Sequence, residues 1–146
     1  MLADNSFATD YYDTSQGKLG ITFVGHGSLV FSYQEKVIHV DPFGEMADYG
    51  QLPKADLIVI THEHDDHLDL QAIEAIKKSG TQILQSGSCA EQGNEGTILK
   101  NGEKITVLGI EIEAVPAYNV QHMRPDGKPF HPQGQGNGYV FNFANL

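Results

Sequence analysis

The sequence has few basic residues, a single cysteine and no long apolar run. No stretch approaches the roughly 18 apolar residues that a membrane-spanning helix needs, so no membrane span is predicted. Nine Lys and Arg residues stand against 19 acidic residues, which gives a formal net charge of −10. Because proteins bind phosphate backbones largely through Lys and Arg, we expect no nucleic-acid partner. Because no span is predicted, we expect no membrane partner either.

The lone cysteine, Cys89, bears on the cellular compartment. It cannot form an internal disulfide, which favours a reducing, cytoplasmic environment. The first residues show no basic region followed by an apolar one, so no signal peptide is predicted. A periplasmic location is the alternative if a signal peptide was removed before residue 1. No base accompanies Cys89 in the sequence, so we do not predict that it is a nucleophile.

The length of 146 residues predicts one domain with its own hydrophobic core. Runs of β-branched and aromatic residues between turn signals predict strands at Leu19–Val24, Leu29–Tyr33 and Lys36–Val40. Asp56–Thr61 is a continuous apolar run, typical of a strand buried on both faces. A helix is predicted at Leu70–Lys78, with Asp69 or Asp66 as its N-cap.

The second half of the chain predicts more strands and one long loop. The strands are expected at Thr81–Gln85, Ile98–Lys100, Lys104–Leu108, Ile110–Val115 and Gly138–Phe143. Asn101-Gly102 predicts a hairpin between Ile98–Lys100 and Lys104–Leu108. Tyr118–Gly138 shows no periodicity, and loops of that length are usually functional or disordered.

The segment Thr61–Asp69 carries the chemistry, because it holds three histidines and four acidic residues directly after the buried strand. Imidazole and carboxylate groups are the usual ligands of catalytic zinc and related metals. His62 and His64 are two residues apart, so in an extended segment they project the same way and can bind one metal. Asp66 and His67 can reach a second metal beside it. The alternative is an acidic, histidine-rich helix cap that binds nothing in particular.

The segment His62–His67 (HEHDDH) resembles the H-x-H-x-D-H signature of the metallo-β-lactamase superfamily. Ile21–Ser28 and Val37–Pro42 are similar to the opening hairpins of the branch that includes the ascorbate-6-phosphate lactonase-like proteins. Three further segments resemble bacterial and archaeal metal-dependent hydrolases of that branch: Pro116–Asn119, Phe130–Pro132 and Gly138–Val140. The resemblance runs from Ile21 to the last residue.

The resemblance implies an α+β fold, the αββα four-layer sandwich. This chain would supply its N-terminal half and the start of its second half. The resemblance also implies that His62 and His64 bind the first metal, and that Asp66 and His67 bind the second. Asp66 would in addition accept a proton near the attacking water.

Other positions have weaker assignments. His131 is the candidate for the third ligand of the first metal, because Asn119, in the neighbouring motif, is a poor zinc ligand; His122 is expected to be a loop residue. Asn119 is instead expected to support a metal ligand or to line the substrate pocket. Asp41 either orients a ligand histidine or is a turn residue before a proline. His26 either faces the active site or belongs to an ordinary loop. His39 is expected to pack within its strand.

The sequence departs from the superfamily pattern near its end. No aspartate follows Asp126 and no histidine follows His131, so a bridging aspartate and a late histidine ligand are missing. We expect a domain that is incomplete at its C-terminus; a degenerate relative or a site completed by another chain are the alternatives. A homo-oligomer could cover the exposed sheet edge.

These observations predict a metal-dependent hydrolase. In this hypothesis a metal-bound hydroxide attacks an ester, lactone or phosphoester bond of a small-molecule substrate. The expected cofactor is zinc, as one or two ions, with manganese or iron as alternatives. The competing hypothesis is a non-catalytic metal-binding or interaction module with an incomplete site. Nucleic-acid processing is disfavoured by the acidic charge.

Overall fold

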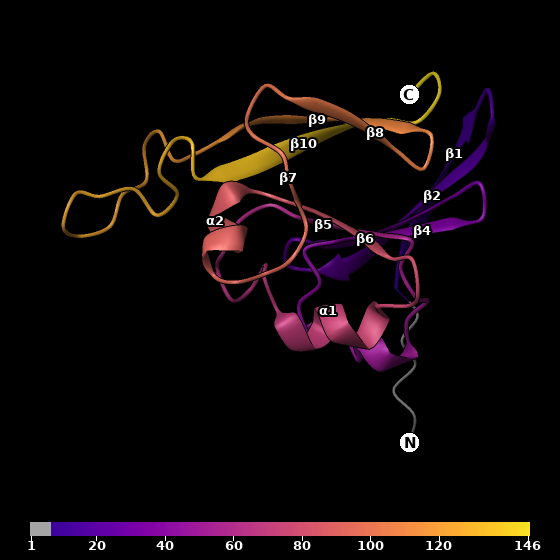
Figure 1. Cartoon of the computed structure of the whole chain (residues 1–146), viewed down its shortest axis with the longest axis horizontal. Helices are drawn as coiled ribbons and strands as arrows, with labels where there is room; N and C mark the ends of the chain where they lie inside the picture. The colour runs from indigo at the N-terminus through magenta and orange to yellow at the C-terminus, as the bar shows by residue number, and fades with distance from the viewer. Residues whose placement is uncertain (1–6) are drawn as a thin grey trace.

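Two β-sheets face each other in the computed structural model, which describes residues 7–146 (Figure 1). The larger sheet has seven strands in chain order: β1 (Thr9–Thr14), β2 (Gly17–Gly25), β3 (Ser28–Tyr33), β4 (Lys36–Val40), β5 (Leu57–Ile60), β6 (Gln82–Gln85) and β7 (Thr97–Ile98). Strands β1 to β4 pair antiparallel, and β4 to β7 pair parallel. The smaller, antiparallel sheet has the order β10 (Gly136–Asn142), β9 (Ile110–Ala117), β8 (Lys104–Val107).

Strand β5 shows how the core is divided into two layers. Successive side chains of a strand point to opposite faces. Leu57 and Val59 therefore face the smaller sheet, whereas Ile58 and Ile60 pack with helix α1 (Leu70–Ile76), and all four are fully buried. This accounts for the continuous apolar run in the sequence, because a strand covered on both faces has no side that needs polar residues.

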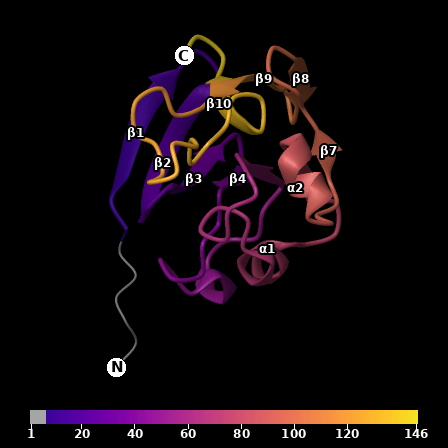
Figure 2. The same cartoon turned by 90° about the vertical axis from the view of Figure 1, so that its left-hand side faces the viewer.

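Helix α1 lies on the side of the larger sheet away from the smaller one, whereas the short helix after β6 lies at one end of the two sheets (Figure 1 and Figure 2). The buried residues of α1, of the short helix α2 (Gly87–Glu91) and of the 3-10 turn Tyr49–Gln51 all belong to that one core. The predicted arrangement of two sheets with helices outside is thus confirmed. Within residues 7–146 it forms three layers, with no helix over the smaller sheet. None of the described helices is long and apolar enough to cross a membrane.

Most of the predicted elements are present, with changes at their ends. Helix α1 ends at Ile76 rather than Lys78, because Lys77 adopts an extended conformation. The amide of Lys78 then donates to Oγ1 of Thr81 instead of continuing the helix. Strand β1 and helix α2 were not predicted, since β1 is exposed along most of its length and α2 is a five-residue segment that begins with Gly87.

The hairpin predicted around Asn101-Gly102 is wrong. Strand β7 adds parallel to β6 in the larger sheet, whereas β8 pairs with β9 in the smaller sheet. The side chain of Asn101 donates to the Gly136 carbonyl and to Asn137 Oδ1, so the turn joins the two sheets. The actual hairpin turn is Leu108-Gly109, where both residues have positive φ angles of 54° and 78°.

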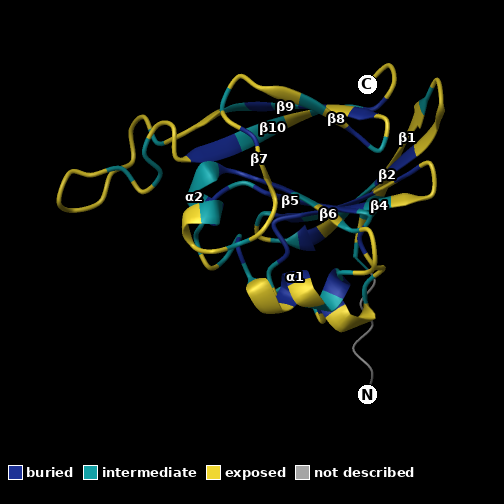
Figure 3. Cartoon of the chain, viewed as in Figure 1, coloured by how far each residue is buried: buried dark blue, intermediate teal, exposed yellow. Residues whose placement is uncertain are grey.

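The long loop occupies residues 118–135, between the end of β9 and the start of β10. We call this segment the excursion. It projects from one end of the two sheets and is mostly exposed (Figure 3). The strands on either side of it pair with each other, with Ala117 opposite Gly136. The excursion is therefore an insertion at the tip of a hairpin.

Candidate metal centre

The candidate site lies at the carboxyl ends of β4 and β5. Because these strands are parallel, the residues that follow them, Asp41 and Thr61, meet at the same edge of the sheet. The amide of Thr61 donates to Oδ1 of Asp41 at 2.8 Å. After His64 the chain turns sharply, since the His64 carbonyl accepts from the amides of His67 and Leu68. This turn brings His67 back towards the strand ends.

Helix α1 begins directly after that turn. Oδ1 of Asp69 accepts from the amides of Gln71 and Ala72, so Asp69 is the N-cap and Asp66 is not. Oδ2 of the same carboxylate accepts from the amide of Gly44 at 2.8 Å. Asp69 therefore joins the start of the helix to the segment after β4. Asp66 is left free to face the histidines.

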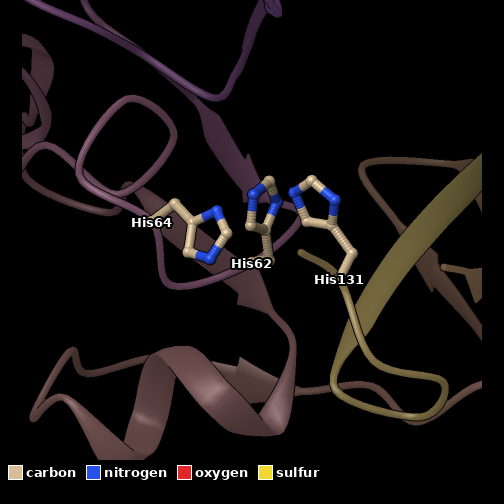
Figure 4. Close-up of side chains that lie close together, drawn as sticks. All are labelled: His62, His64 and His131. Atoms are coloured by element: carbon tan, nitrogen blue, oxygen red, sulfur yellow. The ribbon is translucent and has the colours of Figure 1, made fainter. Parts of the chain in front are cut away.

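Three histidines form the first candidate group of ligands. One ring nitrogen from each of His62, His64 and His131 lies within 4.8 Å of the others. The ring centroids are separated by 4.6 Å for His62–His64, 4.8 Å for His62–His131 and 5.0 Å for His64–His131. Figure 4 shows the three rings converging, with His131 arriving from the excursion. The structure thus places together the three residues predicted for the first metal.

The protonation of His62 suits a metal ligand. Oγ1 of Thr61 donates its proton to Oδ2 of Asp41, so it must accept from Nδ1 of His62, 2.8 Å away. Nε2 of His62 is then unprotonated; it is buried and has no hydrogen-bond partner among residues 7–146. Burial, followed by the neighbouring His67, His64 and His131, lowers the pKa of His62 to about 4. A buried, unpartnered lone pair on a neutral imidazole fits a bound metal ion.

The second group consists of His26, Asp66 and His67, whose ligand atoms also lie within 4.8 Å of one another. Nε2 of His26 is 2.9 Å from Oδ2 of Asp66, and Nε2 of His67 is 3.9 Å from Oδ1. The rings of His62 and His67 have centroids only 4.1 Å apart, so the two groups adjoin. His26 thus lies in the site rather than in an unrelated loop.

Charges within the second group shift two pKa values. Burial alone would lower the pKa of His67, but the hydrogen bond and charge of Asp41 and the charge of Asp66 together outweigh burial and raise it. Burial alone would raise the pKa of Asp66, but His67, the backbone and His26 together lower it. Asp66 is therefore ionised at neutral pH and available as a ligand or proton acceptor.

The remaining candidates occupy distinct places. Asp41 is 2% exposed and binds Thr61 and His67, which suits its predicted orienting role. Asn119 contacts His131 through its side chain. His39 is buried in β4, with Nε2 2.9 Å from the Pro53 carbonyl, and belongs to neither group.

His122 and Cys89, which were not predicted as site residues, lie outside both ligand groups. His122 is exposed in the excursion and belongs to neither ligand group. Cys89 is fully buried in α2, and burial raises the pKa of its thiol. A buried thiol with a raised pKa is a poor nucleophile.

Sequence reasoning missed the residues that attach the smaller sheet to the site. The amide of Asn137 donates to the Thr61 carbonyl at 2.9 Å, and the hydroxyl of Tyr139 donates to the Ile60 carbonyl at 2.9 Å. A Cβ atom at Gly136 would lie 3.3 Å from Cβ of His62. The available signal was the Gly-Asn-Gly sequence at 136–138, because small residues permit close approach of the backbone.

A cavity of about 430 Å³ adjoins the first group. It is lined by His62, His64 and His67 and by residues of the excursion, including Tyr118 and Phe130. No Lys or Arg among the described residues lines it. The cavity therefore joins a cluster of metal-ligand atoms to a largely uncharged wall.

Two facing sheets carry two adjoining groups of candidate metal ligands at one end, the arrangement that the comparisons with known proteins then assign to a family. The family model described as the β-lactamase superfamily domain matches residues 20–146, and the chain belongs to this superfamily. The chain is 33% identical over 135 residues to a UPF0173 metal-dependent hydrolase of Thermococcus onnurineus, and the match covers 86% of this chain and 57% of that protein. A second UPF0173 metal-dependent hydrolase, from Nanoarchaeum equitans, is 28% identical over 123 residues, covering 82% of this chain and 54% of the relative. The chain thus spans about half the length of the curated relatives it matches.

Solved structures show the same fold. A proposed metal-dependent hydrolase from Parabacteroides distasonis is 45% identical, with a TM-score of 0.89, and the match covers 96% of this chain and 63% of that one. The diiron β-hydroxylase CmlA from Streptomyces venezuelae has a TM-score of 0.62 at 16% identity, covering 92% of this chain and 29% of that one. The second likeness bears on the fold alone.

Proposed function

We propose that this chain is the metal-binding part of a hydrolase that cleaves an ester, lactone or phosphoester bond in a small molecule. The observation that carries the proposal is the convergence of His62, His64 and His131 on one point, with Nε2 of His62 buried and unpartnered. Membership of the superfamily and similarity to proteins named metal-dependent hydrolases support it.

The residues present suit a metal cofactor. The three imidazoles would hold one ion, and Asp66 and His67 would contribute to a second beside it. We propose zinc, with manganese or iron as alternatives, because imidazole and carboxylate ligands accept all three. A divalent ion in such a site lowers the pKa of coordinated water to about 7 and polarises a carbonyl or phosphoryl oxygen.

The surrounding residues have separate tasks. The ionised carboxylate of Asp66 would accept a proton, and the ring of His26, 2.9 Å from it, would hold that carboxylate in place. Asp41 and Thr61 would orient the ligand histidines. Tyr118 and Phe130 would contact the uncharged part of the substrate and exclude water from the cavity.

Metal content and turnover test the proposal together. Purified protein should contain one or two zinc, manganese or iron ions per chain by elemental mass spectrometry, and His62→Ala/His64→Ala should lose them. In a screen of carboxylic esters, lactones and phosphodiesters, Asp66→Asn should lower turnover by about 100-fold or more, the range typical of a lost general base. Asp65→Asn is the matched control, because Asp65 is exposed and belongs to neither ligand group. A folded sample that binds no metal, or an Asp66→Asn variant with unchanged turnover, would contradict the proposal.

A further inference from the structure

Asn119 and His131 form a reciprocal pair at the base of the excursion. The Asn119 amide donates to the His131 carbonyl at 3.0 Å, and the His131 amide donates to Oδ1 of Asn119 at 2.6 Å. Nδ1 of the His131 ring lies 2.9 Å from the same Oδ1. Three contacts therefore join the residue just beyond β9 to a histidine twelve positions later.

These contacts determine which ring nitrogen of His131 carries the proton. A backbone amide can only donate, so the atom of Asn119 that faces it is the carbonyl oxygen Oδ1. An amide oxygen can only accept, so Nδ1 of His131 must also donate to it. In a neutral imidazole the other nitrogen, Nε2, then has the free lone pair. His131 thus has the same protonation pattern as His62, whose Nδ1 donates to Thr61.

The same contacts argue against Asn119 itself as a metal ligand. Its Oδ1 already accepts two N–H groups, the backbone amide and the ring Nδ1–H of His131. An amide oxygen that already accepts two hydrogen bonds orients the ligand His131 and does not itself bind the metal. Asn119 therefore acts on the metal site only through His131.

The distal part of the excursion is held by contacts of its own. The Arg124 amide donates to the Lys128 carbonyl, the Gly127 amide donates to the Arg124 carbonyl, and Met123 forms a bridge with Pro129. None of these contacts involves His131. Among the hydrogen bonds of the excursion, the one from Asn119 is the one that reaches the His131 ring.

We propose that Asn119 is the positioning residue for the third histidine ligand. It selects the Nδ1–H tautomer of His131 and directs Nε2 towards His62 and His64. The inference rests on the proposed metal site, since a positioning residue requires a ligand to position. It narrows the expectation that Asn119 supports a ligand or lines the substrate pocket to one specific contact, the one with His131.

Binding of Co²⁺, measured from its visible absorption, tests the role without any substrate. Asn119→Leu removes the acceptor at nearly constant size, and it should weaken Co²⁺ binding by about 10- to 100-fold, the usual effect of losing such a support. Asn119→Asp keeps an oxygen acceptor for both N–H groups and should restore wild-type affinity. Val120→Ser, at a residue that is 73% exposed in the same excursion, should leave affinity unchanged. Urea unfolding without metal would show whether each variant is folded.

Nitrogen-15 NMR of the histidine rings in metal-free wild-type protein supplies a second measurement that does not depend on any variant. It should show His131 protonated at Nδ1.

An Nε2-protonated ring, or Asn119→Asp weakening Co²⁺ binding as much as Asn119→Leu, would overturn the inference. So would unchanged affinity in Asn119→Leu while His131→Ala loses it. Unchanged affinity in His131→Ala would overturn it too, by showing that His131 is no ligand. If the wild type binds no metal, the proposed function fails, whereas the ring NMR still tests the tautomer assignment separately.

Discussion

The hydroxyl of Thr61 donates a 2.6 Å hydrogen bond to Oδ2 of Asp41. The same carboxylate oxygen lies 2.8 Å from Nδ1 of His67, and Oγ1 of Thr61 lies 2.8 Å from Nδ1 of His62. One buried carboxylate therefore orients a histidine of each candidate ligand group, directly in one case and through a hydroxyl in the other. Hydrogen bonds of this kind set the tautomer of a ligand histidine and leave Nε2 for the metal.

Replacing the Thr61 hydroxyl with a methyl group of similar size should disconnect this network. In Thr61→Val the buried Nδ1–H of His62 has no acceptor, which should lower the free energy of unfolding by about 1–3 kcal/mol. Metal affinity should also fall by about 10- to 100-fold. Thr61→Ser, which keeps the hydroxyl, is the matched control. Urea unfolding and metal titration measure the two effects, and a Thr61→Val protein that binds metal like the wild type would show that the hydroxyl has no orienting role.

A methyl group at Gly27, a residue that belongs to neither ligand group, should displace the ring of His67. A Cβ atom there would lie 2.9 Å from Cε1 and 3.3 Å from Nδ1 of His67, closer than ordinary van der Waals contact allows. Gly27→Ala should therefore lower the free energy of unfolding by about 1–3 kcal/mol, typical of an overpacked site. It should also weaken binding of the second metal, measured as ions per chain.

The control for this substitution is Gly87→Ala at the start of α2, where a Cβ atom would meet nothing within 4 Å. Its stability should be unchanged or raised by up to about 1 kcal/mol, because alanine reduces the freedom of the unfolded chain. Equal losses of stability in the two variants would refute a specific contact between residue 27 and His67.

Stability should fall in mild acid because of His39. Burial lowers the pKa of His39 to about 4, from an ordinary value of 6.5, although the hydrogen bond to the Pro53 carbonyl opposes the change. A histidine with a lowered pKa stabilises the fold fully above pH 6.5, and this contribution is lost as pH falls towards 4. At 1.36 kcal/mol per pKa unit the loss approaches about 3 kcal/mol.

His39→Gln isolates this contribution. The glutamine amide can still donate to the Pro53 carbonyl, but it does not titrate. His62, whose pKa is also lowered to about 4, titrates over the same range in both proteins and cancels in the comparison. Urea unfolding of metal-free samples between pH 7 and 4.5 should show a smaller acid loss in the variant. Parallel pH dependences would show that His39 does not contribute.

Local features of the chain were readable from the sequence. The apolar run that forms β5, the helix α1 with Asp69 as its cap, and the close spacing of His62, His64, Asp66 and His67 all depend on residues a few positions apart. The spacing of these residues along the chain indicates which side chains lie on the same face of an element or in the same turn. This is why a metal site at the end of a buried strand could be predicted before the fold was known.

Contacts between distant segments were decided only in the tertiary structure. The turn signal at Asn101-Gly102 was correct as a turn, but sheet packing sends the strands on either side of it to different sheets. From the sequence, His131 was only one candidate in a long loop. In the structure, the pairing of β9 with β10 brings the two ends of that loop together, and Asn119 contacts the His131 ring. The sequence by itself determined the features that depend on neighbouring residues, namely a cluster of histidines and carboxylates directly after a buried strand. The third histidine, its support and the Asp41–Thr61 network needed the two sheets to pack, because long-range contacts depend on which strands pair and leave no period in the sequence.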